Sequence, residues 1–300
     1  MNQHTLKKTY SFEGKGLHTG KYTRMRLCPA PVDTGVVFIR TDLGGKRIPA
    51  TADNVRSTRR STLLGKGSAE VGTVEHLLSA LTGLGIDNVL VEVDNREVPI
   101  LDGSAAKFVN SIANDGLLEQ DAPRKWVEIP HEIIVRNSKT GAWVKVAPAA
   151  KPSVELTIDF KQRFPGKQTV TFSPEDDYAT QIAPCRTFCF LSEVWMLTVL
   201  GLAQGGDLGN AIVIADKPVS GLLRWALSHR FGKKNIEVKP EGYLSNVELH
   251  FPDECARHKL LDIIGDLRLC GGFPRVRIEA YKAGHTLNTA AAKEIFKVKK

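Results

Sequence analysis

The sequence predicts an α+β protein made of two halves, each with several strands and about two helices. Its length of 300 residues suits two domains of about 150. Strand-like alternation stops at the polar, proline-marked stretch 121–125 and resumes at Trp126. We therefore place one domain at 1–123 and the other at 124–300, although no short-period sequence repeat relates them.

Composition is that of an ordinary globular chain, with 42% hydrophobic and 25% charged residues. No apolar run reaches the ~18 residues of a membrane-spanning helix, and residues 1–8 lack the apolar segment of a signal peptide. The expected location is the cytoplasm. The five cysteines include no Cys-x-x-Cys pair, so we expect reduced thiols that mostly pack.

The net charge is 41 − 33 = +8, which favours an anionic partner. A phosphorylated small molecule, nucleic acid and an anionic membrane surface all fit that sign. Because the basic residues are scattered and no aromatic platform accompanies them, we expect no nucleic-acid partner and at most peripheral membrane contact. The expected state is a monomer that acts on a small molecule.

The first half opens with strand-like alternation over 9–40, which glycines interrupt. Residues 14–20 predict a tight turn without the Lys-Ser/Thr ending of a phosphate loop. Its glycines allow the backbone to approach a ligand closely, so His18 is a candidate ligand contact. An ordinary turn histidine explains the same residue equally well.

A helix is predicted after Thr73, which is a suitable N-cap, and Gly83 or Gly85 would end it. Leucines supply its apolar face, and Glu75 and His76 fall in its first turn. Adjacent helical residues lie about 100° apart, so one could bind a metal while the other reaches water beside it. The alternatives are a surface glutamate favoured by the helix dipole and a half-buried histidine.

The remaining elements follow from alternation, apolar runs and turn residues. In the first half we expect a strand at 87–94 and a helix from a cap at Asp102 or Ser104 to about 115. In the second half we expect strands at 126–135, 142–147, 153–160, 168–172, 211–215 and 275–280, and helices at 221–231 and 289–300. The apolar segment 191–202 is either a core helix or the wall of an apolar channel.

Residues 257–267 predict a mostly apolar, buried helix. His258, Asp262 and Asp266 are spaced at i, i+4 and i+8, so they line one stripe of it. A buried row of one imidazole and two carboxylates is costly unless something offsets it, and a divalent metal such as Zn²⁺ would do so. A solvated polar stripe on an amphipathic helix is the alternative.

Together, His76, His258 and Asp262 would supply three nitrogen and oxygen ligands and leave a fourth position open, as catalytic zinc sites do. Glu75, next to one ligand, would then be a general base. His285 follows a predicted strand end, where catalytic groups often lie, so it is a candidate acid or base. These residues predict a zinc hydrolase.

Long motifs resemble those of the UDP-3-O-acyl-N-acetylglucosamine deacetylases, the zinc amidases of the committed step of lipid A biosynthesis. The motifs lie at 73–80, 257–262, 265–267 and 284–285, with matching flanks at 16–20, 29–35, 98–105 and 186–188. The resemblance covers nearly the whole chain. It implies two α+β domains of similar topology, helices sandwiched between two β-sheets, and an active site at the domain junction.

The resemblance also implies the reaction, which is hydrolysis of the 2-acetamido group of an acylated UDP-amino sugar with release of acetate. His76, His258 and Asp262 would hold one Zn²⁺. Glu75 would take a proton from the attacking water. This chemistry is implied by motif position and agrees with the metal-site hypothesis drawn from the residues alone.

Further roles come from the same resemblance. The Thr187 hydroxyl would stabilise the oxyanion together with the metal. His285, oriented and kept charged by Asp266, would stabilise that oxyanion and protonate the leaving amine. The residues in contact with substrate would be Lys259, Phe188 and His18, with Leu191 and Leu200 in the passage for the acyl chain.

The sequence departs from the family pattern in two places. Residues 217–246 are longer than in many members, and 206–210 has Leu-Gly where a polar-acidic pair is expected. Both concern the shape of the acyl passage and therefore the preferred chain length. Some family members are fused to a downstream acyl-carrier-protein dehydratase, and a chain ending at Lys300 is expected to lack that activity.

Two other functions fit parts of the pattern. A zinc amidase or deacetylase acting on a different acylated amino sugar would use the same ligands. A binding module that keeps the fold without activity would have lost a ligand or an acid–base residue. Because Glu75, His285 and all three ligands are present, we expect an enzyme.

Overall fold

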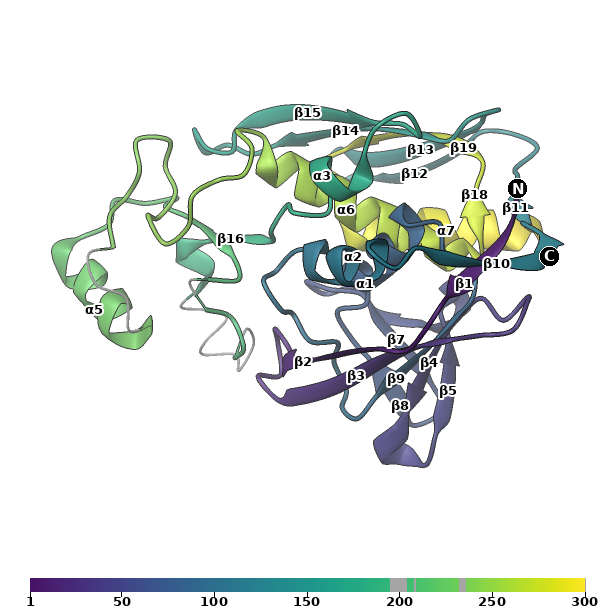
Figure 1. Ribbon diagram of the computed structural model, residues 1–300. Coiled ribbons are helices and arrows are strands. Elements are labelled where there is room, and N and C mark those ends of the chain that lie inside the picture. The colour runs from purple at the N-terminus through teal and green to yellow at the C-terminus, as the bar shows by residue number, and fades with distance from the viewer. Residues whose placement is uncertain (195–203, 208, 232–235, 300) are drawn as a thin grey trace.

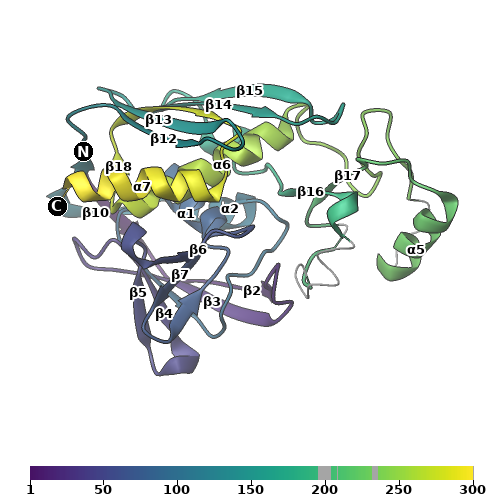
Figure 2. The ribbon, with the colours of Figure 1, turned by 180° about the vertical axis from the view of Figure 1, so that it is seen from behind.

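The computed structural model describes residues 1–194, 204–207, 209–231 and 236–299. Two five-stranded sheets face each other, and helices α1 (Glu75–Gly83), α2 (Ala106–Ala113), α6 (Glu254–Leu267) and α7 (His285–Lys299) lie between them (Figures 1 and 2). The protein is therefore an α+β fold with helices enclosed by sheets, as the resemblance implied. No helix in the described ranges is long and apolar enough to cross a membrane.

The first sheet has the strand order β2-β3-β9-β4-β5. Its members are β2 (Tyr10–Lys15), β3 (Tyr22–Pro29), β4 (Val36–Arg40), β5 (Lys46–Pro49) and β9 (Val89–Val93). The central strand β9 is antiparallel to β3 and parallel to β4. Along β3, Met25 and Leu27 are buried and Arg24 and Arg26 are exposed, so one face of this sheet supplies the core.

The second sheet repeats this arrangement in the order β12-β13-β19-β14-β15. Its members are β12 (Ile133–Asn137), β13 (Ala142–Pro148), β14 (Ser153–Asp159), β15 (Lys167–Phe172) and β19 (Val276–Tyr281). The last strand in sequence again lies at the centre, antiparallel to β13 and parallel to β14. The two halves of the chain thus share one strand order.

A parallel pair of strands needs a crossover connection, and a helix makes it in each half. Helix α1 (Glu75–Gly83) lies between β4 and β9 in the chain, and α6 (Glu254–Leu267) lies between β14 and β19. These two helices pack directly on each other, with α2 (Ala106–Ala113) against α1 and α7 (His285–Lys299) against α6. Equivalent positions in the two halves therefore meet at the centre of the molecule.

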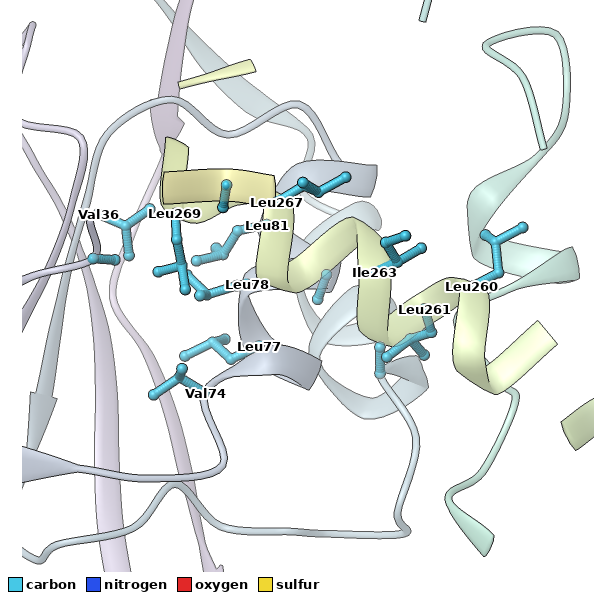
Figure 3. Close-up of a cluster of buried hydrophobic side chains, with 14 of the residues drawn as sticks. Val36, Val74, Leu77, Leu78, Leu81, Leu260, Leu261, Ile263, Leu267 and Leu269 are labelled. Atoms are coloured by element: carbon cyan, nitrogen blue, oxygen red, sulfur yellow. The ribbon is translucent and has the colours of Figure 1, made fainter. Parts of the chain in front are cut away.

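The contact between α1 and α6 is apolar and close. Figure 3 shows leucine and isoleucine side chains of the two helices in one buried cluster, which includes Leu77, Leu78, Leu81, Leu261, Ile263 and Leu267. Gly265 lets the two backbones approach, because a Cβ atom there would lie 2.0 Å from the carbonyl oxygen of Glu75. The close contact at Gly265, the neighbour of Asp266, thus fixes how the two helices pack against each other.

The predicted starts of helices α1 and α7 need correction. Thr73 does not cap α1, because its φ is +56° and its hydroxyl donates to Glu97 at 2.7 Å. Helix α7 begins at His285, earlier than the predicted 289, because tertiary partners use the polar side chains that made this stretch look like a loop. Asn288 donates to Asp266, and Thr286 bonds to Thr58.

The predicted strand 126–135 is also wrong, because this stretch forms two separate strands. Strand β11 (Trp126–Val127) pairs with β18 (Phe273–Pro274), whereas β12 pairs with β13. Pro130 lies between them and has no backbone N–H to donate. The structure also contains β1 (Asn2–Leu6) and β10 (Leu117–Pro123), an antiparallel pair that the weak alternation did not indicate. The domain boundary at the end of β10 stays a prediction.

Smaller elements surround this core. They are β6 (Val55–Ser57), β7 (Leu63–Lys66) and β8 (Ala69–Val71) in one sheet, the parallel pair β16 (Phe188–Phe190) and β17 (Ile212–Ile214), helices α3 (Tyr178–Gln181) and α5 (Gly221–Phe231), and 3-10 helices η1 (Thr41–Leu43), η2 (Ala52–Asn54) and η3 (Arg268–Cys270). Helix α5 has the predicted bounds and lies to one side of the sheets, beyond β16 and β17 (Figures 1 and 2). None of the five cysteines, all of which lie in the described ranges, forms a disulfide, and three are buried.

Candidate metal centre

Three potential ligands meet where α1 packs on α6. His76 lies on the first turn of α1, and His258 and Asp262 lie one turn apart on α6. Their donor atoms all fall within 4.8 Å of one another, and all three side chains are buried. Asp262 Oδ1 is 3.7 Å from His76 Nε2 and 3.5 Å from His258 Nε2. Two atoms that share a tetrahedral ion at about 2.0–2.2 Å lie at such separations.

The two imidazoles are in the protonation state that a metal requires. Burial lowers the pKa of His76 to about 3 and also lowers the pKa of His258, so both rings are neutral near pH 7. His258 Nδ1 donates to the carbonyl oxygen of Cys185 at 3.0 Å, which leaves the lone pair on Nε2. A backbone carbonyl that fixes the tautomer of a ligating histidine is a common outer partner of metal sites.

Buried polar atoms without hydrogen-bond partners indicate whether these residues could hold a cation. Asp262 Oδ1 and His76 Nδ1 are buried and have no hydrogen-bond partner among the described residues. The other oxygen of Asp262 accepts from Lys259 Nζ at 2.7 Å. Burial opposes ionisation of Asp262, but Lys259 and the nearby imidazoles lower the pKa of this carboxyl well below its usual range. A buried carboxylate oxygen left without a donor, next to two neutral imidazoles, fits a divalent cation.

Glu75 lies next to this group without belonging to it. Its Oε2 accepts from the backbone N–H of Thr62 at 3.0 Å, and its Oε1 is 3.8 Å from His285 Nε2. Burial raises the pKa of Glu75 to about 8. A carboxyl group whose pKa lies near neutral pH, beside a cation site, can both take up and release a proton.

His285 faces the site from the first turn of α7. Its Nδ1 donates to Asp266 Oδ2 at 2.9 Å, and its Nε2 points toward the ligands, 3.9 Å from Asp262 Oδ2. Asp266 is fully buried and also accepts from Asn288 at 3.0 Å. Burial alone would lower the pKa of His285, but the surrounding carboxylates, Asp266 foremost, raise it to about 9. The ring is therefore an imidazolium at pH 7.

In the metal-free chain we expect the imidazole of His285 to lose its proton near pH 9, above the ~6.5 of a free histidine. The raised pKa keeps the ring charged through neutral pH and releases the proton only in alkaline solution. Titration of imidazole ¹⁵N chemical shifts by NMR measures this value. Asp266→Asn removes the main source of the shift and should return the titration toward ~6.5. A wild-type titration below pH 7 would contradict this assignment.

The segment after α3 lies along the first turn of α6. Arg186 is bound to the buried carboxylate of Glu254 through its backbone N–H at 3.0 Å and its Nε at 2.9 Å. This anchor positions the Cys185 carbonyl beside His258. Thr187 is held by backbone hydrogen bonds to Gly103 and from Ile212, both at 2.8 Å.

Phe188 and Lys259 lie together on one side of the ligands. The ring of Phe188 is 6.4 Å from the ring of His258, and Lys259 Nζ is 5.5 Å from the centre of the phenyl ring. Burial lowers the pKa of Lys259, but Asp262 outweighs that effect and raises it, so the side chain is an ammonium ion. A cation and an aromatic face next to the ligands could contact a polar, anionic substrate.

His18 lies in the glycine-marked loop between β2 and β3. Its backbone N–H and that of Thr19 donate to the carboxylate of Glu97 at 2.9 and 2.8 Å. Both ring nitrogens are buried and have no hydrogen-bond partner among the described residues. Burial lowers the pKa of His18, and the charge of His285 contributes to the shift. The ring is therefore neutral near pH 7.

Of the two residues predicted to line the acyl passage, the structure describes only Leu191. Leu191 is buried in a small apolar cluster, separate from the main core, with Val213, Leu227, Ile236 and Leu244. Leu200 lies outside the described residues, as does most of the apolar segment 191–202. The structure therefore brings Glu75, His285, Asp266, Lys259 and Phe188 to the ligands and gives no contact of Leu191 with them.

Three groups at the site were missed from the sequence. Thr62 bonds to Glu75 and Asp266, Asn288 bonds to Asp266, and the Cys185 carbonyl bonds to His258. The two partners of each bond are separated in the chain. A threonine, an asparagine or a backbone carbonyl also forms no sequence motif that would mark it as part of a site. No local pattern could have identified them.

Comparison with known proteins gives a consistent result. A family model described as UDP-3-O-acyl N-acetylglycosamine deacetylase matches residues 3–227 and 230–297. The chain is 40% identical to the UDP-3-O-acyl-N-acetylglucosamine deacetylase of Myxococcus xanthus over 98% of its own length and 86% of that protein. It is 39% identical to the deacetylase of the same name from Trichormus variabilis, with 98% of each chain covered.

Other relatives are longer. The chain is 43% identical to the bifunctional enzyme LpxC/FabZ of Porphyromonas gingivalis over 98% of its own length, but the match covers 64% of that protein. The bifunctional enzyme of Bacteroides thetaiotaomicron is 40% identical, with 65% of its length covered. The chain thus spans a little less than two thirds of these bifunctional relatives.

Proposed function

The chain belongs to the UDP-3-O-acyl-N-acetylglucosamine deacetylase family, and from this membership we propose that it hydrolyses the 2-acetamido group of UDP-3-O-(3-hydroxyacyl)-N-acetylglucosamine. The products are acetate and the UDP-3-O-acyl-glucosamine, in the committed step of lipid A biosynthesis. One structural observation supports the proposed metal-dependent hydrolysis. Two imidazoles and a carboxylate from crossover helices of both halves converge beside a buried glutamate and a charged histidine.

We propose that His76, His258 and Asp262 hold one Zn²⁺. When bound, zinc lowers the pKa of water and polarises a carbonyl group. The neutral imidazoles, the buried carboxylate and the unpaired Asp262 oxygen support this choice of metal, because nitrogen and carboxylate oxygen are its normal ligands. Lys259 stabilises Asp262 from the side away from the imidazoles.

The proton transfers are assigned to Glu75 and His285. Glu75 accepts a proton from the water that attacks the amide carbonyl, and the N–H of Thr62 holds its other oxygen. His285, charged at pH 7 and oriented by Asp266, stabilises the developing oxyanion. It then donates its Nε2 proton to the nitrogen of the breaking C–N bond. Water thus adds across the amide, giving acetate and an amine.

The remaining residues are assigned to substrate binding. The Thr187 hydroxyl adds a donor for the oxyanion, Lys259 and Phe188 contact the sugar and acyl parts, and His18 is a further contact. Leu191 and Leu200 belong to the proposed acyl passage. The net charge of +8 favours a diphosphate. The proposal includes a monomer that works in the cytoplasm, with the domain boundary at 123/124.

Acetate release from the UDP-acylglucosamine substrate by the zinc-loaded chain tests this function. Mass spectrometry should show loss of one acetyl group with the O-acyl chain and the UDP intact. The same assay on an acylated N-acetylglucosamine without UDP is the control, and it should be much slower. Release from the control alone would point to a deacetylase of another amino sugar, and release from neither would reject the proposed activity.

A further inference from the structure

The assignments so far use only the backbone N–H of Thr62, yet this residue contacts two groups of the site at once. It immediately precedes β7, and its side chain is fully buried. Its backbone N–H donates to Glu75 Oε2 at 3.0 Å, and its hydroxyl donates to Asp266 Oδ1 at 2.6 Å. Glu75 and Asp266 belong to α1 and α6, so one residue bonds to catalytic groups on both crossover helices.

Each of these bonds selects one orientation of a carboxylate. With Oε2 of Glu75 bound to Thr62, only Oε1 faces His285, whose Nε2 is 3.8 Å away. Asp266 uses Oδ2 for His285 and Asn288, and its Oδ1 has the Thr62 hydroxyl as donor. A rotation of either carboxyl group would cost a hydrogen bond to a buried polar group.

We propose that Thr62 is a positioning residue, which aims the proton acceptor Glu75 with its N–H and locks the Asp266–His285 pair with its hydroxyl. It contacts neither the proposed ligands nor the reacting atoms, so its effect passes through Glu75 and Asp266. The inference rests on the proposed deacetylation. It adds a reason why the acceptor and the donor keep a fixed geometry relative to each other.

A purely structural role is the competing explanation, since loss of any buried hydrogen bond lowers stability. Thr5 provides a matched control. It is buried, donates to the carbonyl of Asn88 at 2.7 Å and accepts from the N–H of Ala30 at 3.0 Å, all away from the site. Thr62→Val and Thr5→Val each remove one buried hydroxyl with little change of shape.

The test compares kcat, KM, zinc content and thermal unfolding of the zinc-loaded wild type, Thr62→Val, Thr62→Ser and Thr5→Val. For Thr62→Val we expect kcat to fall about 10- to 100-fold, the usual effect of losing an outer partner of a metal site. KM and zinc content should stay near the wild-type values. Thr62→Ser keeps the hydroxyl and should recover most of kcat. Thr5→Val should lose stability but keep kcat.

The outcomes separate this inference from the proposed function. No acetate from the wild type would reject the function itself. An active wild type with an unchanged kcat in Thr62→Val would overturn the inference, as would a loss of kcat that only follows a loss of zinc or of folded protein. If Thr62→Val does not fold, Thr62→Ala deletes the same hydroxyl without adding a methyl group and is judged by the same criteria.

Discussion

Replacing Glu75 by glutamine is expected to lower acetate release by about 10²- to 10⁴-fold while the zinc content stays at the wild-type level. General acid–base catalysis contributes a factor of this size. Glutamine has the same shape and can still accept the N–H of Thr62 through its amide oxygen, so the local structure should persist. It cannot take a proton from water. Acetate release and metal analysis of one preparation measure both quantities.

His76→Ala is the matched comparison for Glu75→Gln, because the two residues are neighbours on α1 with different proposed roles. Loss of a ligand should remove zinc and turnover together. Loss of the base should remove turnover alone. If Glu75→Gln also lost the metal, or if it kept full activity, the division of roles between residues 75 and 76 would be wrong.

Gly265→Ala is expected to lower the free energy of unfolding by about 3 kcal/mol, at the upper end of the range for an overpacked core. The new Cβ would lie 2.0 Å from the carbonyl oxygen of Glu75, and this neighbour is backbone that cannot rotate away. Helix α1 would have to move from α6, which separates His76 from His258 and Asp262. Urea unfolding and metal analysis should therefore show lower stability and lower zinc content together.

Gly221→Ala is the control for this substitution, because Gly221 is also a helical residue and nothing lies within 4 Å of the place that the new methyl group would take. Alanine is a better helix former than glycine by about 1 kcal/mol. Gly221→Ala should thus be neutral or stabilising. A Gly265→Ala variant that is as stable and as rich in zinc as the wild type would show that the close approach of the two helices is not required.

The cluster of candidate metal ligands could be predicted in part because the spacing of His258 and Asp262 reflects helix geometry. His258 and Asp262 are one turn apart on α6, and the apolar residues between them indicate burial. His76 is in the first turn of α1, as expected. The sequence could not show that α1 and α6 touch. That contact follows from the shared strand order of the two sheets, which no sequence repeat marks.

The outer partners of the site could not be predicted for a different reason. Thr62 lies far from Asp266 in the chain, and Asn288 looked like part of a loop until α7 was seen to begin at His285. Their roles depend on tertiary contacts that no periodicity records. The same limitation explains Thr73, whose hydroxyl bonds to Glu97 although its position before a helix predicts a cap.

The central claim is that one zinc ion, held by His76, His258 and Asp262, is required for turnover. The most direct test strips the purified chain of metal and adds zinc in steps while acetate release is measured. Activity should be absent at the start, rise in proportion to zinc, and level off at one ion per chain. Full acetate release from the metal-free chain, or zinc binding at one equivalent that leaves the chain inactive, would contradict the account.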